Sequence, residues 1–166
     1  MRVQVAASIA LMFAAISGAV AAPPDNMKLS GGNEPNDGPL LNPATLYKDS
    51  VDALKANRWA DAKVSLGYLL QVTPQDASTN FLAGLADSGL GDWQSARKHY
   101  EAAVRFDRKL VQAQQELAVT YARLGKPEKT QERLQELQRQ NAACGGTCPD
   151  AAKLQTAITV VKKALG

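Results

Sequence analysis

The chain has 166 residues, of which 45% are hydrophobic, so it is long enough to bury one hydrophobic core. Aromatic residues make up only 5%, which leaves leucine and alanine to fill most of that core, as is usual for packed helices. The formal net charge is +3, with acidic and basic residues interspersed along the predicted helices. This pattern lacks the basic block typical of nucleic-acid binding, so we expect no nucleic-acid partner.

Residues 1–21 are predicted to be a secretory signal peptide. Arg2 precedes an apolar run over residues 3–16, and the small residues at 19–21 are typical of a cleavage site. The alternative is an uncleaved membrane anchor, because the apolar run approaches the ~20 residues that span a bilayer. The first interpretation predicts an exported, soluble, periplasmic protein with no membrane insertion after cleavage.

Residues 22–42 are predicted to be a flexible leader. They contain four prolines and three glycines with almost no apolar periodicity, so they bury too little surface to offset the entropy lost on ordering. The alternative is that Leu40 and Leu41 fold back onto the first pair of helices.

Six helices are predicted after the leader, arranged as three hairpins of equal length. Asn42 has the side chain of a helix cap and Pro43 suits a first helical position. Pro74 ends the first hairpin, because proline disfavours helical geometry in the residue before it. The predicted helices span 43–56, 59–72, 77–89, 93–106, 111–124 and 127 to about 140.

An internal repeat supports this division. Trp59 and Trp93 are the only tryptophans, they stand 34 residues apart, and each is followed three residues later by alanine, Ala62 and Ala96. Self-similarity at a fixed period is typical of repeat architectures. The same shift aligns Ser50 with Gly84 and Ala118, Asn57 with Gly91 and Gly125, Leu66 with Tyr100 and Leu134, and Leu69 with Ala103 and Leu137.

This pattern resembles the tetratricopeptide repeat family, whose 34-residue motif has a small residue at position 8, glycine at 15, alanine at 20, a large residue at 24 and proline at 32. Counted from Pro43, the resemblance covers residues 43–76, 77–110 and 111–142. It implies an all-α, right-handed solenoid of helical hairpins. Position 20 is Thr130 and position 32 is Ala142 in the last unit, so we expect a degenerate terminal repeat.

A disulfide corner and a capping helix are predicted for residues 143–166. In an oxidising compartment Cys144 and Cys148 are expected to form a structural disulfide. A redox pair is the alternative, but three residues separate the cysteines, whereas catalytic disulfides favour two. A metal site would need further ligands close by, and the single histidine, His99, lies far away in sequence.

The last helix is predicted to cover the apolar face that the third hairpin would otherwise expose. Apolar residues recur every three or four positions, with lysines between them. The alternative is an amphipathic helix that binds a partner. The predicted inward residues are Ala151, Leu154, Ile158, Val161 and Leu165.

The sequence favours a protein that is not an enzyme. His99 falls on a predicted solvated helix face and is interpreted as a surface residue rather than a base. The chain has no Gly-x-Ser-x-Gly turn and no glycine loop for phosphate, and its carboxylates are scattered. We therefore expect no catalytic residue, no metal and no cofactor.

The resemblance also implies a binding groove. In the family, positions 2, 5, 9 and 12 of the first helix in each hairpin line a concave surface that accepts a peptide or a partner helix. The alternative is that these side chains only pack hairpin against hairpin. The predicted groove comprises Tyr47, Val51, Phe81, Leu85, Gln115 and Val119, rimmed by Lys48, Lys55 and Arg123.

The predicted function is a non-enzymatic scaffold in the cell envelope that binds a protein or peptide partner. One family subgroup grips a terminal carboxylate with lysine, asparagine and arginine, and this chain lacks those residues. The positions of that carboxylate clamp hold Tyr47, Val51, Leu82, Gln112 and Glu116. The alternatives are a structural subunit that self-stacks into a homo-oligomer or joins an envelope complex, and a thiol-disulfide oxidoreductase.

Overall fold

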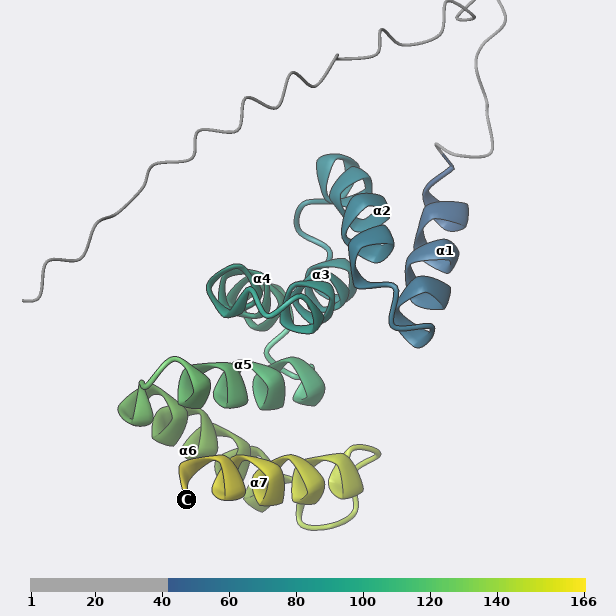
Figure 1. Cartoon of the computed structure of the whole chain (residues 1–166). Helices are drawn as coiled ribbons and strands as arrows, with labels where there is room; N and C mark the ends of the chain where they lie inside the picture. The colour runs from purple at the N-terminus through teal and green to yellow at the C-terminus, as the bar shows by residue number, and fades with distance from the viewer. Residues whose placement is uncertain (1–41) are drawn as a thin grey trace, which may run out of the picture. The chain divides into compact units, whose positions relative to one another are not determined.

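A computed structural model describes residues 42–166. The predicted signal peptide and the leader up to residue 41 lie outside the described residues. From residue 42 onward the chain contains seven α-helices and no strand, which confirms the all-α prediction. None of these helices is long and apolar enough to cross a membrane. The helices are α1 (Pro43–Lys55), α2 (Trp59–Val72), α3 (Ala77–Gly89), α4 (Trp93–Phe106), α5 (Val111–Arg123), α6 (Pro127–Cys144) and α7 (Ala151–Leu165) (Figure 1).

The helices pack as three hairpins that follow one another along the chain (Figure 1). Helix α1 packs against α2, α3 against α4, and α5 against α6. Consecutive hairpins are joined by contacts of α2 with α3 and of α4 with α5. Helix α7 packs against both α5 and α6 and covers the third hairpin as predicted.

Capping residues and left-handed turns set the helix boundaries. The side chain of Asn42 accepts hydrogen bonds from the backbone of Ala44 and Thr45 at the start of α1. Each hairpin then turns through a residue with positive φ at motif position 15, a conformation that glycine adopts freely and asparagine tolerates. These residues are Asn57 (φ 56°), Gly91 (φ 78°) and Gly125 (φ 66°).

One set of repeat positions forms the core. Ala62 and Ala96, at position 20, are both fully buried, and Thr130 takes the same place in the third repeat. The Thr130 hydroxyl donates to the backbone carbonyls of Ala118 and Lys126, so the departure from alanine leaves no unpaired polar group. Positions 8, 24 and 27 are buried too: Ser50, Gly84 and Ala118; Leu66, Tyr100 and Leu134; Leu69, Ala103 and Leu137.

In the second repeat a glycine makes room for a tyrosine. Tyr100 is fully buried, and a methyl group added at Gly84 would overlap its ring. The Tyr100 hydroxyl lies 3.0 Å from that of Ser88, which satisfies its hydrogen bonding inside the core. Gly89 has a similar relation to the indole of Trp59, because an added methyl group would overlap that ring. Large and small residues therefore alternate across α2, α3 and α4.

Motif position 4 has a polar role in two of the repeats. It is a buried leucine, Leu46, in the first repeat, but buried Asn80 and Gln114 in the others. The Asn80 amide donates to the backbone carbonyl of Pro74 at 3.0 Å, and the Gln114 amide donates to that of Arg108 at 2.6 Å. Each amide reaches back six residues and ties the loop between repeats to the next hairpin.

The third hairpin is longer than predicted. Helix α6 ends at Cys144 instead of near residue 140, so Cys144 lies in the last helical turn. Gly145 and Gly146, both with positive φ, turn the chain towards α7. Cys144 and Cys148 form the predicted disulfide, and both pack against the cluster that α7 shares with α5 and α6. The buried residues of α7 are Leu154, Ala157 and Val161, with Ile158 and Leu165 packed beside them.

We predict that replacing both cysteines by serine destabilises the C-terminal helix. The disulfide closes a loop of five residues, and the loop-closure model gives about 2 kcal/mol of stabilisation for that length. Urea unfolding of the wild type and of the Cys144→Ser/Cys148→Ser variant measures the difference. The same variant separates structure from catalysis, because a thiol oxidoreductase would lose insulin-reducing activity. A variant of unchanged stability that lost such activity would contradict the structural role.

Candidate partner-binding surface

The N-terminal part of the predicted groove is open to solvent. Tyr47 projects from α1 with 41% of its surface exposed, and Val51 lies one turn further on, half-buried. The rim lysines, Lys48 and Lys55, are exposed and lie 2.8 Å and 3.9 Å from the carboxylate of Asp52. Because both lysines flank an acidic residue, the rim of α1 carries less positive charge than its two lysines alone would give.

The apolar residues in the middle of the predicted groove are half-buried, because they also pack against the core. Phe81 and Leu85 on α3 pack against the cluster that contains Tyr100 and Leu117. The Phe81 ring centre lies 6.0 Å from that of Tyr100, with the planes tilted by 42°. The packing alternative therefore applies to these two side chains, whereas Tyr47 has no such role in the core clusters.

The C-terminal part of the predicted groove lies on α5. Gln115 lines a hollow of about 260 Å³ between α5 and α7, and Val119 is half-buried one turn away. The guanidinium of Arg123 stacks over the Trp93 ring at 4.5 Å from its centre. Arg123 therefore joins α5 to α4 through a cation–π contact, in addition to any role at the rim. The hollow is lined by Val111, Gln112, Gln115, Ala152, Lys153 and Thr156.

A second hollow was not predicted from the sequence. It has a volume of about 430 Å³, lies between α4 and α6 with α5 as its floor, and contains none of the predicted groove residues. Tyr121 and Leu117 form part of its apolar floor, and charged side chains surround it. The charged lining residues are Glu101, Arg105, Arg108, Lys129, Glu132, Arg133 and Glu136.

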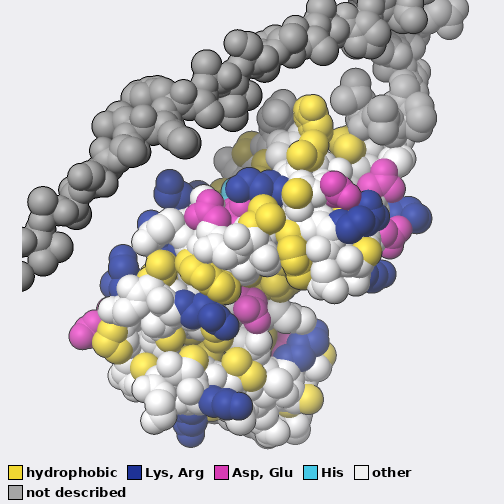
Figure 2. All heavy atoms as spheres, in the orientation of Figure 1, with side chains coloured by type: hydrophobic (Ala, Val, Ile, Leu, Met, Phe, Trp, Pro, Cys, Tyr) yellow, Lys and Arg dark blue, Asp and Glu magenta, His cyan; other side chains and the backbone are white. Residues whose placement is uncertain are grey.

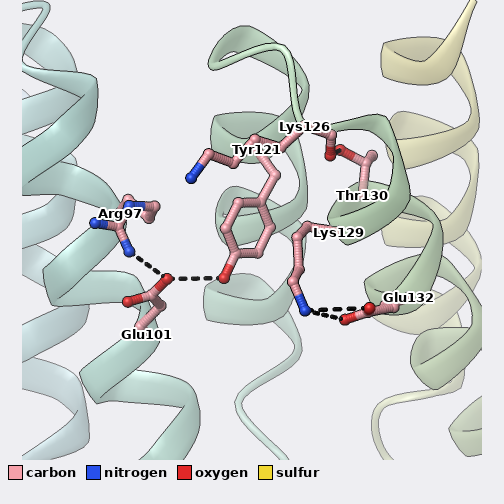
Figure 3. A network of polar contacts seen from close by, with 7 residues as sticks. All are labelled: Arg97, Glu101, Tyr121, Lys126, Lys129, Thr130 and Glu132. Atoms are coloured by element: carbon pink, nitrogen blue, oxygen red, sulfur yellow. Dashed lines mark hydrogen bonds and ion pairs between the residues drawn. The ribbon is translucent and has the colours of Figure 1, made fainter.

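Most acidic residues of this second hollow are already paired (Figure 3). Glu101 accepts from the Arg97 guanidinium at 2.6 Å and from the Tyr121 hydroxyl at 2.8 Å, which links α4 to α5. Burial, with the hydrogen bond to Glu101, raises the pKa of Tyr121 to about 12. Lys129 pairs with Glu132 along α6. The acidic side chains of the second hollow are thus held in ion pairs within the chain.

A buried carboxylate lies among α2, α3 and α4. Asp87 on α3 is 1% exposed, and its oxygens lie 2.7 Å from Lys63 Nζ on α2 and 3.6 Å from His99 Nε2 on α4. His99 is thus half-buried beside an acid, not on a solvated face as predicted. The repeat comparison gave no signal for this cluster, because the matching positions of Asp87 are Ala53 and Tyr121.

We predict that stability falls as the pH drops below about 6.5, the usual value for histidine. Burial lowers the pKa of His99, although Asp87 acts in the opposite direction; Lys63 and Lys98 also lower it. The unfolded chain then binds the proton more readily than the folded chain, so acid favours unfolding. The pKa values of Asp52, Asp92 and Glu136 are lowered as well, so the stability that these carboxylates contribute is lost only at a pH below the histidine range.

Urea unfolding at about pH 7.5 and about pH 5.5 checks this prediction. The wild type should be less stable at the lower pH, and a His99→Gln variant should lose most of that difference. An equal loss in the variant would show that another group is responsible.

The surface contains no concentrated charge on the face seen in Figure 2, where basic and acidic side chains are interspersed. Within residues 42–166, no group of three or more histidine, cysteine, aspartate or glutamate side chains is placed to hold a metal ion.

Comparison with known proteins identifies the fold. No family model matches the sequence, and no curated protein sequence does. Among solved structures, the chain is similar to the TPR2B domain of yeast Sti1 in its complex with pHsp70, at 14% identity and a TM-score of 0.61 over 73% of this chain and 96% of that one. It is also similar to PcrH in complex with the chaperone binding region of PopD, at 19% identity and a TM-score of 0.61 over 72% and 90% of the two chains.

A third similar structure is MamA, at 17% identity and a TM-score of 0.55, over 74% of this chain and 78% of that chain. At such identities the likeness concerns the fold alone. It agrees with the burial of the same motif positions in all three hairpins. The described part of this chain has the tetratricopeptide-repeat fold, as its 34-residue periodicity predicts.

Proposed function

We propose that the protein is a non-enzymatic scaffold that binds a protein or peptide partner on the face formed by the first helices of its hairpins. The observation that carries this proposal is the exposure of Tyr47. It is one of few aromatic residues in the chain, it lies at a groove position, and 41% of its surface is open to solvent. Aromatic side chains supply much of the binding energy at protein interfaces.

Two further observations support this function. Val51 on α1 and Phe81 and Leu85 on α3 are half-buried apolar residues at groove positions, and the two helices contact each other. The structures similar to this chain include two complexes, one with pHsp70 and one with a region of PopD, so the fold serves as a binding scaffold in other proteins. The carboxylate clamp residues are replaced in this chain, so the proposed ligand is an apolar segment of a partner, not a charged chain end.

The proposed location is the cell envelope. The sequence begins with a predicted signal peptide, and the Cys144–Cys148 disulfide is of the kind that persists in oxidising compartments. A partner present in the same compartment is therefore expected.

Capture from envelope extract tests the function. The wild type, a Tyr47→Lys variant and a Gln94→Lys control on α4 are used as baits, and the bound proteins are identified by mass spectrometry. Gln94 is exposed and lies outside the predicted groove, so it matches the added charge without touching the proposed surface. We expect a partner that is retained by the wild type and the control and is reduced at least about tenfold with Tyr47→Lys. Equal retention by all three baits would contradict the groove.

A further inference from the structure

The outer face of α2, turned away from the core, is apolar. Val64 is 60% exposed, Tyr68 49% and Val72 63%, and a spacing of four residues places them along one side of the helix. Ala60 extends the same line by one turn and is also exposed. The buried residues Ala62, Leu66 and Leu69 occupy the opposite side. We call this surface, Ala60, Val64, Gly67, Tyr68 and Val72, the α2 outer face.

The second helices of the other hairpins differ at the matching positions. After shifts of one and two repeats, the positions of Val64 hold Lys98 and Glu132, and those of Gly67 hold Glu101 and Gln135. Solvated helix faces are normally charged in this way. The positions that match the α2 outer face are Gln94, Lys98, Glu101, Ala102 and Phe106 on α4, and Glu128, Glu132, Gln135, Glu136 and Gln140 on α6. Among the second helices of the three described hairpins, only α2 therefore has an uncharged face.

Within residues 42–166, no neighbouring atom requires a glycine at position 67. Glycine in a helix interior is less favourable than any residue except proline. Gly84 and Gly89 are needed because Tyr100 and Trp59 occupy the space of a side chain. A methyl group added at Gly67, by contrast, would meet no atom of the described residues within 4 Å. A glycine in the middle of an exposed apolar face allows another backbone to approach closely.

The charges beside the α2 outer face are neutralised inside the chain. Asp61 lies 2.9 Å from Arg58, and Lys63 lies 2.7 Å from Asp87. A strongly charged partner therefore finds no opposite charge here. A second copy of the same face suits this surface, because each face is uncharged and pairing the two brings no like charges together.

We propose that the α2 outer face is the contact of a homodimer, in which α2 packs antiparallel against α2 of a second copy about a twofold axis near residue 66. In such a contact the same patch serves both subunits. Residues at equal distances from the axis then face each other. Val64 lies opposite Tyr68 of the second copy, and small Ala60 lies opposite larger Val72. The axis passes beside Gly67, where the two backbones come closest.

This homodimer uses the second helix of the first hairpin, whereas the proposed groove lies on the first helices. It does not rest on the proposed function, and the two fail independently. Val64→Glu should abolish dimerisation and leave the Tyr47-dependent capture intact.

Sedimentation equilibrium at several concentrations, on the protein as it is processed in the cell, tests the homodimer. We expect the wild type to dimerise by mass action. Val64→Glu should raise the dimer dissociation constant at least about tenfold, because it buries a charge at the contact. The matched control is Gln94→Glu, which adds the same charge to an exposed site on α4 and should leave the constant unchanged.

Gly67→Ala gives a second, independent variant. The added methyl group meets nothing in the described part of the monomer, so the variant should fold at least as well as the wild type and yet dimerise at least about tenfold more weakly. Circular dichroism verifies that both variants keep their helicity. A wild type that is monomeric at every concentration overturns the proposal. This holds also if the monomer binds phospholipid vesicles through the α2 outer face. A dimer that is insensitive to both variants overturns it too.

Discussion

Replacing Tyr100 by alanine is expected to lower the free energy of unfolding by about 3–5 kcal/mol, the range for removing a large buried aromatic ring. Tyr100 is fully buried and contacts residues of α3, α4 and α5, so the change leaves a cavity where two hairpins meet. Urea unfolding followed by circular dichroism measures the loss. Tyr47→Ala is the matched control: it removes the same side chain from an exposed site and should change stability by no more than about 0.5 kcal/mol.

A comparable loss from both substitutions would contradict this account of the core. It would also show that Tyr47 is a packing residue, which would remove the main support for the proposed groove.

The second large effect is expected from Gly84→Ala. The added methyl group overlaps the Tyr100 ring, and overpacking of a buried site costs about 1–3 kcal/mol. Gly67→Ala is the control, measured at a protein concentration low enough to keep the chain monomeric. It adds the same group where no atom from residue 42 onward lies within 4 Å, and it should stabilise α2 by up to about 1 kcal/mol.

A double-mutant cycle refines this prediction. Gly84→Ala combined with Tyr100→Leu recreates the alanine and leucine found at the same positions in the third repeat, Ala118 and Leu134. The leucine removes the ring that the new methyl group overlaps, so the double variant should be more stable than the sum of the single effects predicts, by about 0.5–3 kcal/mol. Strict additivity would show that the two positions do not compete for the same space.

The sequence was sufficient to predict the helices and their order. Trp59 and Trp93 revealed the period, and Asn42 and Pro74 marked the ends of the first hairpin. These predictions succeeded because capping, turn conformation and burial of small residues depend on short stretches of sequence that recur in each repeat. The predicted end of α6 was wrong by about one turn, because no proline or glycine lies between Pro127 and Gly145 to stop the helix.

The surfaces were harder to predict than the core. Phe81 and Tyr47 share a motif position, yet Phe81 packs beside Tyr100, whereas Tyr47 lies on the first described helix with 41% of its surface exposed. Asp87 and His99 are separated by twelve positions and meet only because α3 and α4 fold back on each other. Polar contacts of this kind do not repeat with the period, so comparison of the repeats cannot reveal them.

Site-specific photo-cross-linking in the living cell tests the proposed groove most directly. A photoreactive amino acid is placed at Tyr47 in one variant and at Lys98, on the exposed face of α4, in another. The groove predicts a cross-linked product with a partner protein from position 47 and none of that size from position 98. Products from position 98 alone would contradict a binding surface on the first helices. So would the absence of products from both positions.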